Sequence, residues 1–312
     1  MIYNNKLIQD IEKIYSERRR QAESAVETVK QTLFANPEYL KLYNQYNATR
    51  FDISKAKFLG EDDKATALTK SAKQIKSDLL KLQLSLGVSD KDLTPKYTCK
   101  ECKDTGKTDD GKRCKCFKKM LAKLTLEELG VDKKKLPSFK KATHLELNNL
   151  DKIYEKMKQY CDIFPNTEKN IVISGTVGTG KSYLAGCIAN ELISKDFNVV
   201  FISACELNSI LIKYHTAPVD EKGVYLDLLI SCDLLVIDDL GSEPIYKNVT
   251  EEYLLMIITE RMLKGNPFII TTNLEQEQLL DRYGDRTLSR LNDKRHGVFI
   301  QIKGEDLRRK KK

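Results

Sequence analysis

The sequence contains no uninterrupted apolar run that approaches the roughly 18 residues a membrane-spanning helix requires. Its opening residues, MIYNNKLIQDIEKIYSERRR, also lack the apolar core of a secretory signal. We therefore expect a cytoplasmic protein with no membrane partner. The chain shows no internal repeat, and because its 312 residues exceed the usual length of one domain, two structural units are expected.

Histidine is scarce, with three residues at positions 144, 215 and 296. Cysteine is more frequent, and four of the eight cysteines are scattered through apolar segments, where we expect small core residues: Cys161, Cys187, Cys205 and Cys232. The other four crowd into eighteen positions. In a cytosolic chain, such crowding indicates a metal site before a disulfide scaffold.

The crowded cysteines form two tight pairs, Cys99-x-x-Cys102 and Cys114-x-Cys116, with eleven residues between them. Four thiolates suffice for a closed tetrahedral Zn²⁺ site, and no histidine lies within the cluster to serve as a ligand. A site with no open coordination position should fold the segment and not catalyse a reaction. An iron–sulfur cluster and unligated thiols are the alternatives.

Positive charge is unevenly distributed along the chain, whose formal net charge is +8. The segment from Lys100 to Lys141 holds 14 Lys or Arg against 7 Asp or Glu, and the chain ends in RRKKK. Such runs permit a polyanionic partner, although they are more often solvated surface. The lysines around the cysteines would offset thiolate charge or contact DNA phosphates. Lys213 and Tyr214 are further candidates for DNA contact.

The first part of the chain has the apolar spacing of helices. One helix is expected to end near Asn36-Pro37 and a second to start at Pro37. A third carries apolar residues three and four apart from Ala65 to Leu86. This seam predicts the core of a small helical bundle, with an exposed docking surface as the alternative.

The second part alternates short apolar runs with helical stretches. The runs NIVISG, NVVFIS, DLLVIDD and PFIITTN lack polar alternation, which is typical of strands buried on both faces. The expected fold is therefore α/β, with a parallel sheet and flanking helices. We expect a helical amino-terminal domain with the cysteine module at residues 1–120, a linker at 121–136 and the α/β domain at 137–312.

A glycine-rich loop follows the first of these strands. Residues 175–182 match the P-loop pattern G-x-x-x-x-G-K-[ST], with a strand before and a helix after: Gly175, Thr176, Val177, Gly178, Thr179, Gly180, Lys181 and Ser182. The glycines let backbone N–H groups wrap a phosphate, and the helix that follows presents its positive end. Lys181 would bridge the β- and γ-phosphates of ATP, and Ser182 would hold Mg²⁺. A chance glycine turn is the alternative.

Polar residues end two of the later strands. Asp238 and Asp239 follow the apolar run CDLLVI, at the edge where open α/β sheets place ligands. Asp238 would hold Mg²⁺ as a Walker-B acid, and Asp239 would polarise the attacking water. Asn273, after FIITT, would position water beside the γ-phosphate. The alternatives are acids that cap the next helix and an asparagine of an ordinary turn.

Arginines follow near the end of the chain. Arg286 and Arg290 are four residues apart and so lie on one helix face, from which an arginine can reach a neighbouring subunit's triphosphate. Arg308 could face the γ-phosphate of its own subunit. Ordinary surface arginines are the alternative.

Together the phrases NIVISGTVGTGKSYLAGCIANEL, LLVIDDLGSE, FIITTN, RTLSRL and GEDLRR resemble the replicative helicase loaders of the DnaC/DnaI type, in the initiator branch of AAA+ ATPases. The resemblance covers roughly residues 137–312. It implies a central P-loop strand, ATP bound between subunits of a homo-oligomer, a hexameric DnaB-type helicase as partner, and single-stranded DNA. It assigns sensor 1 to Asn273, the trans arginine finger to Arg290 and sensor 2 to Arg308. Some of these loaders carry a zinc-bearing amino-terminal domain.

Two other functions remain open. An accessory ATPase of transposition, of the IstB type, shares these motifs but commonly lacks a zinc module. A nucleotide-switched adaptor is the second, because Asp239 stands where most AAA+ proteins have the longer glutamate. That substitution also favours weak or partner-dependent hydrolysis.

Overall fold

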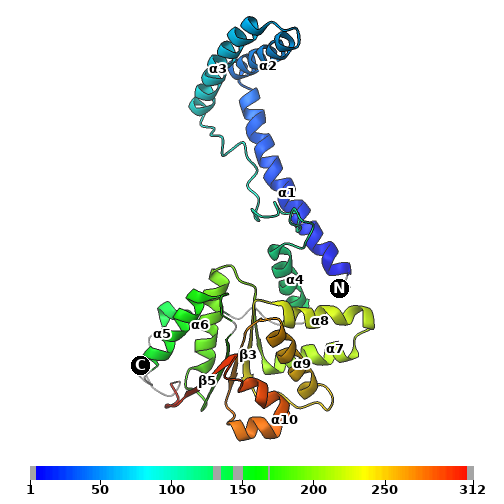
Figure 1. Cartoon of the computed structure of the whole chain (residues 1–312), viewed down its shortest axis with the longest axis vertical. Coiled ribbons are helices and arrows are strands. Elements are labelled where there is room, and N and C mark those ends of the chain that lie inside the picture. Colours follow the sequence, from blue (N-terminus) through cyan, green and yellow to red (C-terminus); the bar gives the residue numbers. More distant parts are fainter. Residues whose placement is uncertain (1–4, 129–134, 143–149, 168, 308–312) are drawn as a thin grey trace. The chain divides into compact units, whose positions relative to one another are not determined.

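A computed structural model of the chain describes residues 5–128, 135–142, 150–167 and 169–307 (Figure 1). The chain divides into two compact units. One unit is Glu12–Cys114, and the other comprises Met1–Ile11 with Lys115–Lys312. These bounds differ from those of the expected domains, because residues 1–11 fall with the α/β part and the helical unit ends at Cys114. The expected division into domains stays a prediction.

Three helices make up most of the amino-terminal part: α1 (Asn5–Phe34), α2 (Pro37–Phe58) and α3 (Asp62–Ser85). The break after α1 is where the sequence predicted it, because Asn36 caps α2 by accepting a 3.0 Å hydrogen bond from the Tyr39 N–H. Helices α2 and α3 pack against each other as a hairpin. The seam of α3 supplies a small core, in which Leu79 is buried with Leu33 and Tyr39. The bundle-core interpretation of the seam therefore holds for this part of α3.

The other unit contains a five-stranded parallel sheet with the order β2-β3-β4-β1-β5. Its strands are β1 (Asn170–Gly175), β2 (Val199–Ser203), β3 (Leu234–Leu240), β4 (Phe268–Thr272) and β5 (Gly297–Ile302). The first four correspond to the four predicted apolar runs, whereas β5 was not predicted. Strand β1 is interior as expected, but the middle position belongs to β4.

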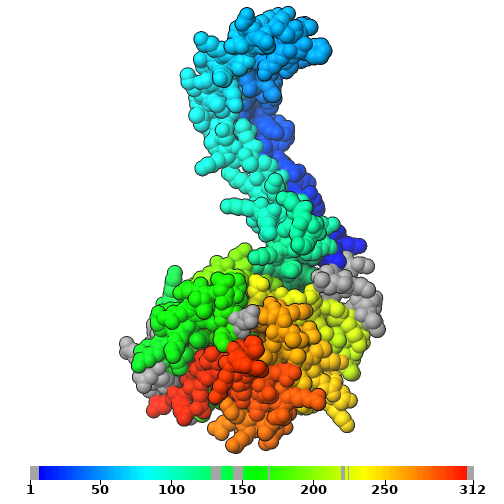
Figure 2. All heavy atoms as spheres, viewed as in Figure 1, coloured from blue at the N-terminus to red at the C-terminus, as the bar shows by residue number. Residues whose placement is uncertain are grey.

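The remaining elements are α4 (Lys115–Glu128), a 3₁₀ turn η1 (Phe139–Lys141), α5 (Asp151–Ile163), α6 (Lys181–Ser194), α7 (Ala204–Thr216), α8 (Val219–Ser231), α9 (Thr250–Leu263) and α10 (Gln276–Leu291). Helices α5 and α6 share one hydrophobic core with the sheet, and α7 to α10 share the other (Figure 1). Successive residues of one strand enter opposite cores: Ile171 and Ile173 face α6, while Val172 faces the other layer. In the view with all atoms drawn, the red surface of the last part of the chain lies between the green and orange parts (Figure 2). Strands β1, β3 and β4 are mostly buried, as their apolar runs predicted, whereas β5 is partly exposed.

The segment expected to be a linker differs from the prediction. Residues 121–128 belong to α4, in which Ala122 joins the core on the α7–α10 side of the sheet. Beyond it, Pro137 lies so close to Gly186 of α6 that a Cβ there would come within 2.6 Å of the proline ring. Both ends of the expected linker are thus tied to the α/β unit. Among the described residues, no helix is long and apolar enough to cross a bilayer.

A fully buried arginine of α9 joins the end of α8 to the start of β4. Arg261 of α9 is 0% exposed and donates to the carbonyls of Leu229 (2.7 Å), Ile230 (3.2 Å) and Pro267 (2.6 Å). The Ile230 carbonyl also accepts Nδ2 of Asn266 at 2.9 Å, and the Pro267 carbonyl also accepts the Leu235 N–H at 3.4 Å. This one side chain thus ties the last turn of α8 to the residue that precedes β4.

We predict that Arg261→Ala lowers the free energy of unfolding by about 3 kcal/mol, since it removes three buried hydrogen bonds and opens a cavity. Urea unfolding followed by far-UV circular dichroism measures the loss. The control is Lys264→Ala, an exposed position on the next turn of the chain, which should change stability by less than about 0.5 kcal/mol. Equal stabilities of the two variants would contradict this role for Arg261.

Candidate nucleotide site and candidate metal centre

The predicted P-loop links β1 to α6, and its glycines occupy positions that side chains cannot. Gly175 has φ 149°, and a Cβ there would lie 2.1 Å from the Ile302 carbonyl oxygen. Gly178 has φ 82°, and a Cβ there would lie 1.8 Å from an Asp306 carboxylate oxygen. The loop therefore packs closely under β5 and the segment after it. Its backbone also bonds that segment, since the Leu307 N–H donates to the Gly178 carbonyl at 3.0 Å.

Lys181 is the buried cation of the site, with 6% of the residue exposed. Its Nζ donates to the carbonyls of Gly175 and Thr176, both at 2.7 Å, and to Oδ1 of Asn273 at 2.6 Å. The amide of Asn273 continues the chain, because its Nδ2 donates to Oδ1 of Asp239 at 2.6 Å. Three of the predicted site residues, from α6, the end of β4 and β3, thus form one hydrogen-bonded chain.

Thr271 of β4 joins both acids of β3, and the sequence reasoning missed it. Its hydroxyl donates to Oδ1 of Asp238 at 2.7 Å and accepts the N–H of Asp239 at 2.8 Å. The side chain of Asp238 and the backbone of Asp239 are therefore fixed by one β-branched residue on the neighbouring strand. Nothing in the sequence distinguished this threonine from an ordinary strand residue.

The backbone is irregular at the second acid. The pairing of β3 with β4 shifts register between Ile237 and Leu240, and Asp239 within that bulge has φ 60°. A bulge of this kind re-aims a side chain, and such bulges are common next to active sites. Here it turns the carboxylate of Asp239 toward Asn273.

A cavity of about 740 Å³ opens over these residues. Its polar side is formed by Lys181, Ser182, Asp238, Asp239 and Asn273 with the loop residues Val177, Gly178 and Gly180. Its apolar side is formed by Ala142, Leu150, Tyr154, Tyr183 and Leu307. The size is that of a small-molecule site. The division suits a ligand with one flat apolar end and one anionic end.

The apolar side was not predicted from the sequence. Leu150 is the N-cap residue of α5, and Tyr154 follows in its first turn. Burial raises the pKa of Tyr154 well above its ordinary value, so the phenol stays neutral. Leu307 comes from the segment after β5, far along the chain.

The predicted arginines lie elsewhere. Arg286 and Arg290 are in the second half of α10, beyond a kink at Gly284, and neither lines the cavity. Arg286 is exposed, while Nε of Arg290 donates to the Thr259 hydroxyl of α9 at 2.8 Å. Arg308 lies outside the described residues.

Comparison with known proteins gives one match to most of the chain. Residues 118–312 match the family described as IstB-like ATP binding protein. The chain belongs to this family. The matched range holds every residue of the cavity, and it begins directly after the cysteine cluster.

Individual relatives are similar over about half of the chain. The replicative helicase loader DnaC of Escherichia coli K12 is 30% identical over 139 residues, which is 44% of this chain and 55% of DnaC. An ATP-binding protein of insertion sequence IS5376 from Geobacillus stearothermophilus is 28% identical over 48% of this chain and 59% of its own length. The crystal structure of DnaI is 21% identical over 55% of this chain and 89% of that one, with a TM-score of 0.44. The chain thus spans little more than half the length of the curated relatives it matches.

The four crowded cysteines, outside the family match, form a second candidate site. Their sulfurs all lie within 4.8 Å of one another, and those of Cys99 and Cys114 are 3.8 Å apart. Zinc–sulfur bonds of about 2.3 Å in a tetrahedron place the sulfurs about 3.8 Å apart, whereas a disulfide needs about 2.05 Å. The cluster therefore has the spacing of metal ligands. Cys102 and Cys114 are buried, and Cys99 and Cys116 are half-buried.

Local hydrogen bonds hold the first cysteine pair in place. The carboxylate of Asp104, which is 0% exposed, accepts the N–H groups of Thr98 (2.7 Å) and Cys99 (2.9 Å). The Gly106 N–H lies 3.4 Å from the Cys102 sulfur. Asp104 was not singled out from the sequence, although it stands between the two pairs in a turn with φ 55°. The residues present fit a Cys₄ zinc site with an ordered second layer.

We predict that only Cys205 reacts quickly with an alkylating reagent in zinc-loaded protein, because it is the exposed cysteine of the chain. Burial raises the pKa of Cys161 and of Cys187 to about 12 and also raises the pKa of Cys232, which leaves these thiols unreactive. Chelation should then release zinc and expose the four cluster thiols. Mass spectrometry counts the adducts, and a metallochromic dye measures the metal.

The matched control is Cys205→Ser, which should lose the fast adduct and keep the chelator-dependent ones. Cluster thiols that react equally fast before and after chelation would contradict the zinc site. A visible absorption band that chelation removes would instead indicate an iron–sulfur cluster.

Proposed function

We propose that this protein is an ATP-dependent loader of a hexameric replicative helicase, and that the loader itself binds single-stranded DNA. ATP with Mg²⁺ binds in the cavity beneath the P-loop, and the amino-terminal helices and zinc module hold the helicase. The observation that carries the proposal is the hydrogen-bonded chain Lys181–Asn273–Asp239, which joins a phosphate-binding lysine to an acid at the carboxyl edge of the sheet.

The cavity gives each residue a role. Its apolar side, with Leu150 and Tyr154, would hold the adenine, and Lys181 would exchange its carbonyl partners for the β- and γ-phosphates. Ser182 and Asp238 line the same cavity and would hold Mg²⁺. The bound ion would neutralise charge that develops on the phosphates. Asn273 and Asp239 together would orient the attacking water.

A neighbouring subunit would complete the site. Arg286 and Arg290 do not line the cavity of their own subunit, so they are available to reach another nucleotide. The bond from Arg290 to Thr259 uses Nε, and a phosphate would bind at the Nη groups. An oligomer joined through the nucleotide follows from this assignment. Arg308 stays a predicted sensor-2 residue.

The helicase would dock on the amino-terminal hairpin. Large apolar side chains are exposed at and near the end of α2, with Phe51 at 71%, Phe58 at 90% and Leu59 at 55%. A hairpin this small has no need of exposed phenylalanines for its own core, and exposed apolar groups of this kind mark protein interaction sites. They form a candidate docking surface that is separate from the seam of α3.

Single-stranded DNA would lie over α7 and α9. The rings of Tyr214 and Tyr253 meet edge to face with centroids 4.9 Å apart, and Lys222 lies 5.6 Å from the Tyr214 ring centre. His215 is bonded to the Tyr253 hydroxyl at 2.8 Å. Aromatic rings held beside lysines are the usual platform for stacked bases.

Two other functions share the same site. The insertion-sequence relative and the family name keep a transposition-accessory ATPase in view. The zinc module outside the family match favours the loader. A nucleotide-switched adaptor differs from both, because it would need ATP binding without hydrolysis.

We predict that Lys181→Ala weakens ATP binding on the order of 100-fold, because it removes charge-assisted bonds to two phosphates. Asp239→Asn should keep ATP affinity within about threefold and lower kcat on the order of 100-fold, since the amide cannot act as a base. Labelled-ATP titration and phosphate release measure the two effects. Lys264→Ala, exposed and remote from the cavity, is the control.

The same variants separate the functions when helicase loading onto circular single-stranded DNA is measured. The loader is supported if wild type loads the cognate helicase and both variants fail. Loading by Asp239→Asn at the wild-type level favours the adaptor. Saturable ATP uptake that survives in Lys181→Ala would sink the proposal itself.

We predict that Tyr214→Ala weakens binding of single-stranded oligonucleotide about tenfold, the loss of one stacked base. The salt dependence of binding should stay the same, because no phosphate contact is removed. Fluorescence anisotropy at several salt concentrations measures both. Tyr246→Ala, an exposed tyrosine in the turn after β3, should bind as wild type does. Equal affinity of the two variants for the oligonucleotide would contradict DNA binding at this surface.

A further inference from the structure

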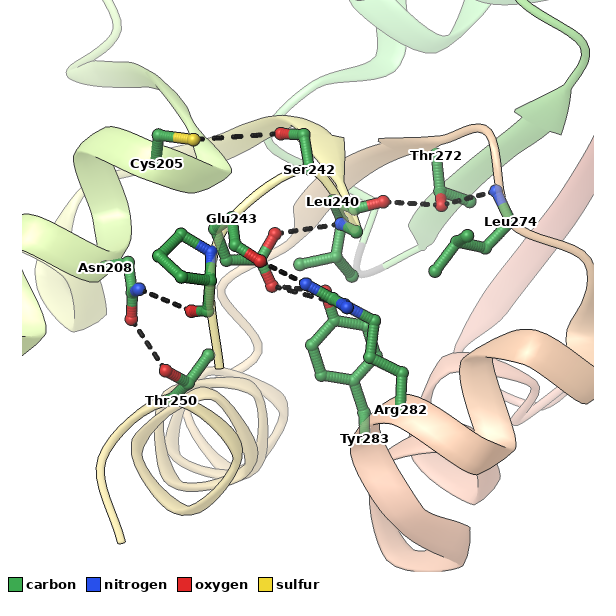
Figure 3. A network of polar contacts seen from close by, with 12 residues as sticks. Cys205, Asn208, Leu240, Ser242, Glu243, Thr250, Thr272, Leu274, Arg282 and Tyr283 are labelled. Atoms are coloured by element: carbon green, nitrogen blue, oxygen red, sulfur yellow. Dashed lines mark hydrogen bonds and ion pairs between the residues drawn. The ribbon is translucent and has the colours of Figure 1, made fainter. Parts of the chain in front are cut away.

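Glu243 is a buried carboxylate in the turn that follows Asp239. It is 2% exposed, and its Oε2 accepts the Gly241 N–H at 2.9 Å (Figure 3). Its Oε1 accepts the hydroxyl hydrogen of Tyr283 from α10 and lies 4.0 Å from Nε of Arg282. Arg282 also donates to the Glu243 main-chain carbonyl. One side chain thus joins the turn after β3 to α10.

Burying a carboxylate is costly unless it is paired and hydrogen-bonded, so an apolar residue would fill this place more cheaply. The hydrogen bonds of Glu243 therefore fix the relative position of the turn and α10, which packing of an apolar residue would not do. Tyr283 is 1% exposed, and burial, followed by its bond to Glu243, raises the pKa of the phenol. Tyr283 keeps its proton across the physiological range, and its hydroxyl donates a hydrogen bond to the carboxylate of Glu243.

The turn carries the position of Glu243 back to Asp239. The carbonyl of Asp239 accepts both the N–H (3.2 Å) and the hydroxyl (2.8 Å) of Ser242. Next to it, the Leu240 carbonyl accepts the Thr272 hydroxyl at 2.7 Å. With Thr271 on the Asp239 N–H, the backbone is fixed on both sides of the acid. The turn that carries Glu243 is therefore tied to Asp239 by hydrogen bonds.

On its other side, Glu243 holds α10 at the kink. Tyr283 directly precedes Gly284, whose φ 75° and ψ 164° divide the helix in two. A Cβ at Gly284 would lie 2.7 Å from a carboxylate oxygen of Glu251, so the kink packs tightly against α9. The half-helix after the kink carries Arg286 and Arg290. Tyr283 is thus held where this half-helix begins.

We propose that Glu243 and Tyr283 are positioning residues that set the direction of the second half of α10 from the turn behind Asp239. They would thereby orient the arginines that complete the neighbouring subunit's nucleotide site. The inference rests on the proposed function, because it needs ATP hydrolysis between subunits. It adds a structural connection from Asp239 in one subunit's nucleotide site to Arg286 and Arg290, which complete the site of the next subunit.

Mixed oligomers test the connection. A donor chain carrying Lys181→Ala cannot bind ATP but keeps its arginines. An acceptor chain carrying Arg286→Ala and Arg290→Ala binds ATP but supplies no arginine. ATP hydrolysis is measured with single-stranded oligonucleotide present, for each chain alone and for the mixture. Only the mixture should hydrolyse ATP above background.

Tyr283→Phe is then added to the donor chain alone. It removes the hydroxyl and keeps the ring, and we expect kcat of the mixture to fall about tenfold, the worth of one buried hydrogen bond to a charged group. The KM for ATP should stay within about twofold, because the acceptor's cavity is unchanged. Tyr246→Phe in the donor, which deletes an exposed hydroxyl three residues from Glu243, should leave kcat unchanged. Thermal unfolding followed by circular dichroism shows that each donor is folded.

Each result has one meaning. An inactive mixture of the two parent chains overturns the intersubunit site and this inference with it. If the mixture is active and Tyr283→Phe in the donor does not slow it, the inference alone is overturned. The donor's own nucleotide site is already inactive, so the donor's Tyr283 can change the rate only through the arginines that it presents to the acceptor. If Tyr283→Phe does not fold, Glu243→Gln in the donor replaces it, with the same fall in kcat expected.

Discussion

The site is organised around the buried ammonium group of Lys181. A cation with so little exposure needs acceptors, and it is held by two loop carbonyls and the amide of Asn273. This requirement draws the P-loop, α6 and the end of β4 toward one point. These three acceptors are neutral oxygens, so a charged triphosphate would bind the ammonium group more strongly. Lys181 could exchange these oxygens for phosphate without a new backbone arrangement.

Residues that bind through local geometry could be predicted from the sequence. The P-loop is set by glycines at fixed spacing, and the acids and Asn273 follow apolar runs that were recognisable as strands. The carboxyl ends of parallel strands then bring them together. Residues that act across elements could not be predicted. Thr271 looks like any β-branched strand residue, and Glu243 meets Tyr283 only because two elements 40 residues apart in sequence are packed together.

The boundary of the α/β unit shows where composition misleads. The segment after Cys116 is rich in lysine, and such charge indicated a solvated linker. Within it, Phe117, Leu121 and Thr125 recur every four residues and are all buried, and they belong to a helix. Its periodic apolar face was the better indicator than its net charge. Strand β5 was missed for a similar reason, since its apolar residues stand in a charged stretch.

The aspartate at 239 departs from the usual glutamate for a reason that lies in the backbone. The bulge in β3 places residue 239 at φ 60°, a left-handed conformation that aspartate and asparagine adopt far more readily than glutamate. From there the short side chain already reaches Nδ2 of Asn273 at 2.6 Å. A glutamate would add backbone strain and extend past the amide. The bulge and the short acid therefore suit each other.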